Sequence, residues 1–249
     1  QSSAASDVYK RQIFGLRIKS GLEVGQINIK SEGIMAAVNS FKIDIKGKQS
    51  HGSRPWNSVD PIVTASQIVN NLQTIVSRNM DLTNAPVVVT VGAIHGGVRS
   101  NIIPESLYML GTIRTFDVNM KEQVHKRIRN IVQMTAEANN ATATIDINKG
   151  YPVTYNDPDL YQEMFPTFER IAGKENVNII KAVTGAEDFS FFQQQVPGIY
   201  FFIGGIPKDF DPAKVADHHT PDFYVDDSGM LLGMKTMTAL TLDYLHKSH

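Results

Sequence analysis

The chain has 249 residues, a length that at about 100–200 residues per domain allows one large or two small domains. Apolar residues make up 42% of it and charged residues 20%, which is the composition of an ordinary globular protein. The 24 basic and 25 acidic residues leave a formal charge of −1, which argues against nucleic acid and membrane surfaces as partners. No cysteine is present, so disulfides, cysteine-type zinc sites and a cysteine nucleophile are excluded within these residues.

The first residues, 1–12, are small and polar and show neither strand nor helix periodicity. They also lack the apolar core of a signal peptide, and we interpret them as a non-native leader joined to an internal point of a longer chain. A loosely ordered native N-terminus is the alternative. The near-neutral charge and the lack of a recognisable signal favour a cytoplasmic location.

Residues 36–149 predict a domain of βαββαβ order. Apolar and charged residues alternate over 41–46, which is typical of a half-buried strand, and this strand ends at Gly47. The first helix is expected to be capped by Asn57 or Ser58. The other elements are helices over 59–79 and 120–139 and strands over 87–91, 105–116 and 142–147. This order is the ferredoxin-like split βαβ arrangement, in which both helices cover one face of an antiparallel sheet.

Residues 150–249 predict part of an α/β layer. The expected elements are a helix over 157–172, strands over 178–183 and 198–203, a long loop over 205–227 and a closing helix over 227–246. Because these elements are too few to cover both faces of such a sheet, we expect the second half of a domain. Its first half would lie upstream of residue 13, where the segment IFGL reads as a buried strand that starts abruptly.

Two stretches of this second part hold candidate site residues. In the loop before the last helix, His218 and His219 with Asp217 and Asp222 could supply a transition-metal ligand and a supporting carboxylate, and a solvated polar loop is the alternative. The stretch TGAEDF at 184–189 forms a strand-to-helix corner in which Gly185 permits a close approach to a ligand, with Glu187 beside it. Its alternative is a capping box that joins Thr184 to Glu187.

The predicted βαββαβ domain holds three more candidates. His51 lies between the first strand and the first helix, where it could act as an acid, a base or a donor to an oxyanion; an exposed loop histidine is the alternative. Asn101 follows a loop that contains Gly96 and Gly97, and Arg114 offers a planar fork suited to a substrate carboxylate, with a surface ion pair as the alternative. The motifs of serine hydrolases, P-loop NTPases and dinucleotide-binding enzymes are absent.

Taken together, these stretches carry a family resemblance that spans essentially all of 13–249. They are IFGL at 13–16, GKQSHGSRP at 47–55, GGVRSNIIPE at 96–105, GTIRTF at 111–116, TGAEDFSFF at 184–192 and HHTPDFYVDD at 218–227. The sequence resembles the zinc-peptidase-like amidohydrolases that include aminoacylases, hippurate hydrolases, indoleacetyl-amino-acid hydrolases and carboxypeptidase G.

The resemblance implies a partial α/β catalytic domain with an inserted ferredoxin-like lid. The lid would be residues 34–150, and residues 13–33 and 151–249 would be the C-terminal part of the catalytic domain. It also implies a site for two divalent metal ions, zinc, manganese or cobalt, and a homodimer formed through the lid. The substrate would be a small N-acyl or aryl-acyl amino acid.

The resemblance further implies roles for individual residues. His219 would ligate a metal ion, and His51 would be the catalytic lid histidine that reaches a substrate carbonyl, usually in the partner subunit's site. Asn101 and Arg114 would hold the carbonyl and carboxylate ends of the substrate, while the stretch from Gly185 to Asp188, Glu187 included, would line the pocket. A metal-bound water would attack the amide carbonyl, and His51 would stabilise the oxyanion that forms.

One residue departs from the family pattern. The stretch after IFGL normally supplies a metal-ligating histidine, but Arg17 stands there, and a guanidinium cannot ligate a metal. The family's other metal ligands and its general base come from the upstream half, so we expect this chain to be inactive alone. A non-catalytic dimerising or ligand-binding module, with Arg17 as its mark, and a dipeptidase or carboxypeptidase of the same superfamily remain as alternatives.

Overall fold

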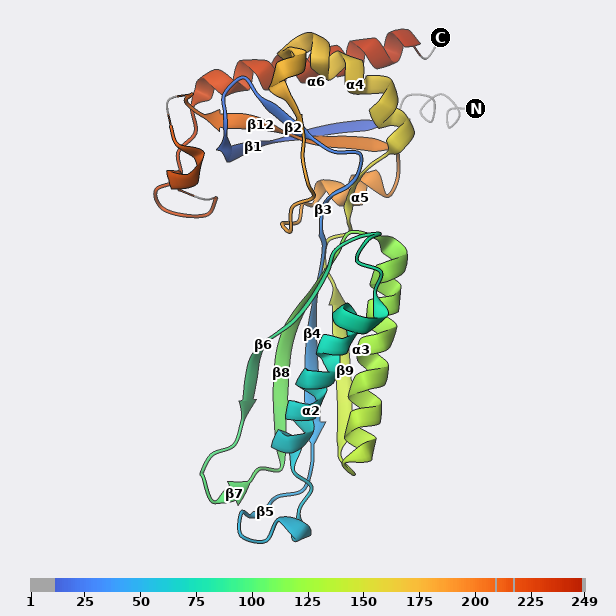
Figure 1. Ribbon diagram of the computed structural model, residues 1–249, viewed down its shortest axis with the longest axis vertical. Helices are drawn as coiled ribbons and strands as arrows, with labels where there is room; N and C mark the ends of the chain where they lie inside the picture. Colours follow the sequence, from blue (N-terminus) through green and yellow to red (C-terminus); the bar gives the residue numbers. More distant parts are fainter. Residues whose placement is uncertain (1–11, 209, 217, 248–249) are drawn as a thin grey trace, which may run out of the picture. The chain divides into compact units, whose positions relative to one another are not determined.

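The computed structural model describes residues 12–208, 210–216 and 218–247. These residues fall into two compact units (Figure 1). Unit 1 runs up to Met35 and resumes at Thr154, and unit 2 is the segment Ala36–Val153 inserted between them. The leader expected at 1–12 lies outside the described residues except for Gln12.

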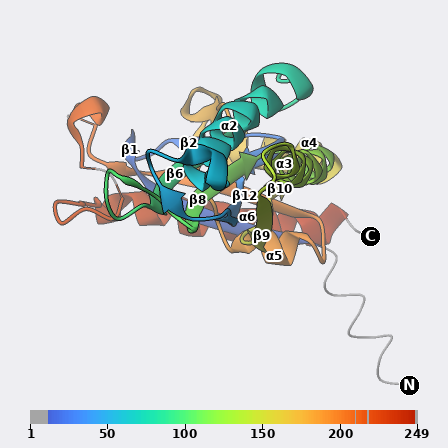
Figure 2. The ribbon, with the colours of Figure 1, turned by 90° about the horizontal axis from the view of Figure 1, so that it is seen from below.

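Unit 2 is a four-stranded antiparallel sheet with two helices. Its main elements are β4 (Ala37–Lys46), α2 (Pro61–Thr74), β6 (Val87–Gly96), β8 (Ser106–Thr115), α3 (Val118–Ala138) and β9 (Thr142–Lys149), with the short strands β5 (Ser50–His51) and β7 (Ile102–Ile103) at one end. The strand order is β6-β8-β4-β9, and α2 and α3 lie on the same side of it (Figure 2). The predicted ferredoxin-like βαββαβ fold is confirmed.

The first helix of unit 2 begins later than predicted. Asp60 caps it, because its carboxylate accepts hydrogen bonds from the backbone N–H groups of Ile62 (2.8 Å) and Val63 (3.3 Å). Asn57 and Ser58, the predicted caps, lie in and just after a separate 3₁₀ turn. Asp60 is the better cap because it directly precedes Pro61, the first residue of the helix. Proline has no backbone N–H that needs a partner, so the Asp60 carboxylate can bond the N–H groups that follow it.

The alternation in β4 follows from its position between the helices and the open face of the sheet. Phe41, Ile43 and Ile45 point toward the helices and are at most 3% exposed, whereas Lys42 and Asp44 are exposed on the other side. Burial of such side chains contributes roughly 1.5–3 kcal/mol each. The alternation of apolar and charged residues along β4 therefore determines which face of the sheet the two helices cover.

One buried histidine in α3 makes the stability of unit 2 depend on pH. His125 is 6% exposed, and its Nε2 atom makes no hydrogen bond to the described residues. Burial lowers the pKa of His125 below its usual 6.5, with Lys121, Arg129 and Lys149 acting in the same direction and Glu122 opposing them.

Because the unfolded chain then binds this proton more readily than the folded one, the stability that neutral His125 contributes is fully present above pH 6.5. It is lost as the pH falls from 6.5 toward the lower folded value. We expect the unfolding free energy of unit 2, followed by the fluorescence of its single Trp56, to fall over this range. His125→Leu should remove the slope and His95→Gln, at an exposed position, should keep it; an unchanged slope in His125→Leu would assign it to other groups.

Unit 1 is built on a mixed sheet. The strands β1 (Ile13–Glu23), β12 (Gly198–Ile206), β2 (Ile27–Ile29) and β11 (Val177–Ile179) lie in that order, and β1 runs parallel to β12. A separate pair is formed by β3 (Glu32–Met35) and β10 (Thr154–Asn156), and the helices are α4 (Pro158–Ala172), α5 (Phe189–Gln193) and α6 (Met230–Lys247). The strand predicted over 178–183 is shorter, and the last helix begins at Met230 after a 3₁₀ turn (Asp227–Gly229). Further 3₁₀ turns occupy Lys174–Asn176 and Pro212–Lys214.

The sheet of unit 1 has two different faces. One packs on α4 and α6 around a core of Ile27, Ile29, Leu160, Met164, Phe168, Ile199, Phe201, Ile203 and Leu240. Leu16 and Ile18 of β1 join this core. The opposite face carries Tyr200 and Phe202, which cluster with Ile34, Met35 and the ring of Phe189. A Cβ on Gly15 would lie 2.6 Å from that ring, so β1 needs a glycine here.

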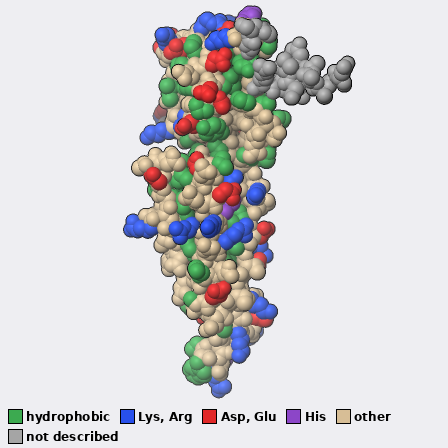
Figure 3. Space-filling view, turned by 90° about the vertical axis from the view of Figure 1, so that its right-hand side faces the viewer, with side chains coloured by type: hydrophobic (Ala, Val, Ile, Leu, Met, Phe, Trp, Pro, Cys, Tyr) green, Lys and Arg blue, Asp and Glu red, His purple; other side chains and the backbone are tan. Residues whose placement is uncertain are grey.

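The surface charges of the chain agree with its near-neutral composition. Basic and acidic side chains are interspersed on the face drawn in Figure 3, in keeping with the formal charge of −1. Within the described ranges, no helix has both the length and the apolarity needed to cross a membrane.

Candidate functional site

His51 and Asn101 lie together at one end of unit 2. His51 in β5 pairs with Ile102 in β7, and the N–H of Gly52 donates to the carbonyl oxygen of Asn101 over 2.8 Å. These loops follow the end of β4 and precede the start of β8, which are neighbours in the sheet. The antiparallel pairing of β4 and β8 thus brings together two predicted residues that are far apart in the sequence.

The hydrogen bonds of His51 fix which ring nitrogen carries a proton. The backbone N–H of Ser53 donates to Nδ1 of His51 over 3.1 Å, and the Ser53 hydroxyl lies 2.7 Å from the same atom. Because Nδ1 accepts, the neutral ring must carry its proton on Nε2. The exposed Nε2–H group can therefore donate a hydrogen bond to a carbonyl or oxyanion.

Arg114 lies near the opposite end of the same sheet. It sits in β8 opposite Val38 and Val88, eight residues from the first residue of the strand, Ser106. At about 3.3 Å per residue this is roughly 26 Å. Arg114 is half-buried, and its side chain makes no hydrogen bond or ion pair with the part of the chain that the structure describes. A single unit 2 therefore does not bring Arg114 to His51 and Asn101.

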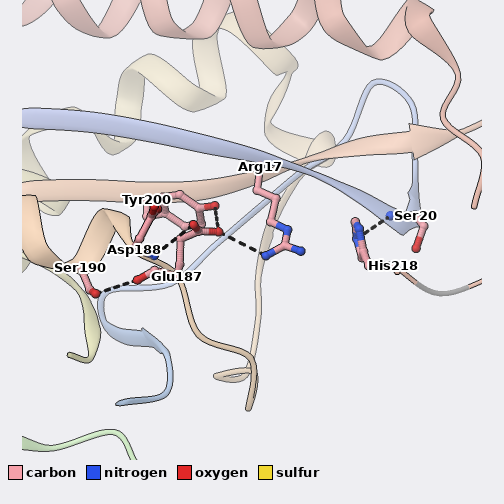
Figure 4. A network of polar contacts seen from close by, with 7 residues as sticks. All are labelled: Arg17, Ser20, Glu187, Asp188, Ser190, Tyr200 and His218. Carbon is pink, nitrogen blue, oxygen red and sulfur yellow. Dashed lines mark hydrogen bonds and ion pairs between the residues drawn. The ribbon is translucent and has the colours of Figure 1, made fainter. Parts of the chain in front are cut away.

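Glu187 is the centre of a polar network in unit 1 (Figure 4). Its Oε2 atom accepts hydrogen bonds from Nη1 of Arg17 (3.2 Å) and from the hydroxyl of Tyr200 (2.8 Å), and its Oε1 accepts from the N–H of Asp188 (3.1 Å). Its backbone carbonyl accepts from the Ser190 hydroxyl (2.7 Å). Glu187 is 21% exposed and Arg17 28%, so this ion pair is largely shielded from water.

Tyr200 keeps its proton in this network. Burial raises the pKa of Tyr200 far above its usual value, and the hydrogen bond to Glu187 raises that pKa further. The phenol therefore remains a donor at neutral pH, and it holds the Glu187 carboxylate beside Arg17.

The corner at 184–189 differs from the predicted capping box. Helix α5 begins at Phe189 with Asp188 as its N-cap residue, which makes no side-chain capping hydrogen bond, and Thr184 lies outside the helix. The capping prediction was wrong because Glu187 turns toward Arg17 and Tyr200 instead. A Cβ on Gly185 would lie 3.2 Å from Cε of Met35, so the glycine allows close packing on this flexible side chain.

His219 is exposed on the loop before α6 and has a positive φ of 67°. His218 beside it accepts a hydrogen bond at Nε2 from the N–H of Ser20 (3.4 Å), and Asp217 lies outside the described residues. Over the described ranges, no three His, Asp or Glu side chains come together as a metal site requires. Near Glu187 the cation is the guanidinium of Arg17, so the residues present do not fit a divalent ion.

The sequence analysis missed two residues of these sites. Tyr200 lies in the apolar run of β12, where it reads as a core residue. Ser53 could have been found, because a hydroxyl two residues after a loop histidine is well placed to bond its ring.

Comparison with known proteins gives a family match for unit 2. Residues 37–140 match the peptidase dimerisation domain. Unit 2 is an M20 peptidase dimerisation domain.

M20 relatives also cover the rest of the chain. The IAA-amino acid hydrolase ILR1-like 4 of Arabidopsis thaliana is 34% identical over 94% of this chain and 53% of its own length. The thermostable carboxypeptidase 2 of Saccharolobus solfataricus is 33% identical over 94% of this chain and 58% of its own. The chain thus spans a little more than half the length of these curated relatives, and its homologues are hydrolases that act on amide bonds.

A solved structure agrees with this relationship. A dinuclear metal-binding M20 peptidase from Bacillus subtilis is 25% identical and superposes with a TM-score of 0.76, over 98% of this chain and 60% of that one. The predicted α/β architecture with a ferredoxin-like dimerisation domain is confirmed, and its structural neighbours are M20 peptidases.

Proposed function

We propose that this chain supplies the dimerising lid and part of the substrate-binding surface of a metal-dependent amidohydrolase that cleaves N-acyl or aryl-acyl amino acids. The observation that carries the proposal is the pairing of the His51 and Asn101 loops, with Nε2–H of His51 exposed. A hydrogen-bond donor at this point suits the oxygen of an amide carbonyl, on which negative charge develops during hydrolysis. The hydrolase relatives support the same reaction class.

In this proposal the substrate contacts are divided between two subunits. His51 and Asn101 would contact the substrate carbonyl, and Arg114 would hold its carboxylate through a planar fork. Since His51 and Arg114 are separated by most of the length of β8, a homodimer in which one protomer's His51 meets its partner's substrate accounts for both roles. Gly185 and Glu187 of unit 1 would also contact the substrate.

The metal part of the proposal concerns two divalent ions, zinc, manganese or cobalt, with His219 as one ligand. Bound ions would polarise the carbonyl and supply a metal-activated water. The described residues do not fit a complete site, since no group of three ligands is assembled and Arg17 already pairs with Glu187. We therefore propose that this chain alone does not turn over substrate. The cytoplasm is the proposed location, on the strength of the near-neutral charge.

The Arg17–Glu187 pair also favours a second candidate function, a non-catalytic ligand-binding and dimerising module. A dipeptidase or carboxypeptidase activity is a third, supported by the carboxypeptidase relative. The three differ in whether an amide bond is cleaved and in the group on the carbonyl side of that bond, which is a simple acyl group in one case and an aminoacyl or peptidyl group in the other.

A chimera tests the role of the lid. Residues 36–153 would replace the corresponding domain of the Saccharolobus carboxypeptidase, and hydrolysis of N-acyl amino acids would be measured. We expect His51→Ala in the chimera to lower kcat by about 10²–10³-fold, the usual cost of losing one oxyanion donor. The matched control is His95→Ala in β6, a histidine whose ring stacks on Tyr108, and this change should leave kcat unchanged. An active chimera that is insensitive to His51→Ala would contradict the proposed role.

A further inference from the structure

Two basic side chains share one face of β1. Leu16 and Ile18 point into the core beneath α4 and α6, so Arg17 and Lys19 between and after them point to the opposite face. The side chains of residues two apart on a strand lie about 7 Å from each other. Nζ of Lys19 lies 5.6 Å from the ring centre of Phe202, which belongs to the apolar cluster of that same face.

Among the described residues, Glu187 is the one carboxylate that forms an ion pair with either of these cations. Arg17 bonds Glu187 through Nη1 alone, which leaves its Nε and Nη2 donors without a hydrogen-bond partner among the described residues. Lys19, half-buried, makes no ion pair in the same part of the chain. The charge of the neighbouring Asp188 acts on Tyr200, but among the described residues its carboxylate forms no ion pair with either cation. Arg17 and Lys19 therefore keep hydrogen-bond donors available to a ligand on a half-buried face.

The arginine is held in place before any ligand arrives. Tyr200 and Arg17 bond the same oxygen of Glu187, and Tyr200 is itself buried and packed between Phe189 and Phe202. An oriented guanidinium loses little freedom on binding, and its remaining N–H groups present the fork that matches a planar carboxylate. The aromatic rings beside it offer an apolar surface for the rest of such a ligand.

We propose that Arg17 and Lys19 form a binding site for the carboxylate of a small organic acid on this face of unit 1. The site binds its ligand directly through the guanidinium and requires no metal ion. The site shares Glu187 with the surface proposed for the hydrolase, but it requires neither hydrolysis nor a residue of unit 2.

The test is a titration of the chain by calorimetry at pH 7 in EDTA and low salt, with two matched probes. N-acetyl-L-alanine carries a carboxylate, and N-acetyl-L-alanine amide has the same shape without the charge. We expect saturable binding of the acid only, a dissociation constant at least 10-fold higher in Arg17→Gln, and a weaker loss in Lys19→Gln. Raising the salt concentration should weaken the binding, since both partners are charged.

Two controls keep the result interpretable. Arg17→Gln could disturb Glu187 and lower the melting temperature. Lys19 forms no ion pair with a described carboxylate, so Lys19→Gln tests the site without that side effect. Lys235→Gln removes an exposed charge from α6, on the other side of the sheet, and should bind as the unaltered chain does. Equal binding of the amide, no binding of the acid, or unchanged affinity in both Arg17→Gln and Lys19→Gln would overturn the proposal. None of these results would bear on the His51 chimera, which contains only unit 2.

Discussion

Replacing Phe168 by alanine is expected to lower the unfolding free energy of unit 1 by about 3–5 kcal/mol. Phe168 is fully buried in α4, and its ring meets that of Phe201 edge to face at 5.0 Å, so its loss leaves a cavity between helix and sheet. The melting transition, followed by circular dichroism, measures the change.

The matched control is Phe192→Ala. The side chain of Phe192 is 58% exposed at the end of α5, and such a substitution is expected to change stability by less than about 0.5 kcal/mol. Equal effects at Phe168 and Phe192 would mean that the core of unit 1 is not packed as the structure has it.

A change of similar size is expected at a polar residue. Asn156 is 0% exposed, its side-chain amide donates to the carbonyl oxygens of Lys30 (2.7 Å) and Tyr200 (2.8 Å), and its oxygen accepts from the N–H of Tyr200 (2.6 Å). Asn156→Ala leaves these three buried groups without a partner, at about 1–3 kcal/mol each. We expect a loss of roughly 3–5 kcal/mol and faster hydrogen exchange in β12.

Asn178→Ala is the control for this prediction. The side-chain amide of Asn178 donates only to the side chains of Gln26 and Asn28, in a partly exposed position of β11. Loss of this amide should lower the unfolding free energy by about 1 kcal/mol or less. If Asn156→Ala were as mild, Tyr200 would not depend on Asn156 for its position beside Glu187.

The fold of unit 2 could be predicted from the sequence because each element there follows one simple period. Alternation over 41–46 placed one face of β4 toward the helices, and the structure has the same residues buried. The start of α2 could not be fixed in the same way, because Asn57, Ser58 and Asp60 are all good capping residues. Only the backbone path into Pro61 selects Asp60.

The candidate sites depend on contacts between distant segments that the sequence did not predict. Arg17 and Glu187 are 170 positions apart, and nothing local indicates that they form an ion pair. Tyr200 reads as a core aromatic until the register of β1 and β12 sets it on the same face as Arg17. The distance from His51 to Arg114 likewise follows only from the length and direction of β8. Contacts between distant segments depend on strand register, which local patterns do not contain.

Arg17 takes part in both proposals made for unit 1, the lack of a complete metal site and the binding of a carboxylate. The guanidinium of Arg17 is held by Glu187 and places a fixed positive charge on this face. That charge repels a divalent ion and attracts an anion. The same positive charge thus underlies two expected results for unit 1, the absence of metal-dependent turnover and the binding of a carboxylate.

The most direct test is an assay of the chain itself for hydrolysis of N-acetyl amino acids, with zinc, manganese or cobalt added and with EDTA in parallel. With Arg17 paired to Glu187, we predict no turnover above that of the metal ions alone. Clear turnover that EDTA abolishes would contradict this prediction and would show that the residues of this chain assemble a working metal site.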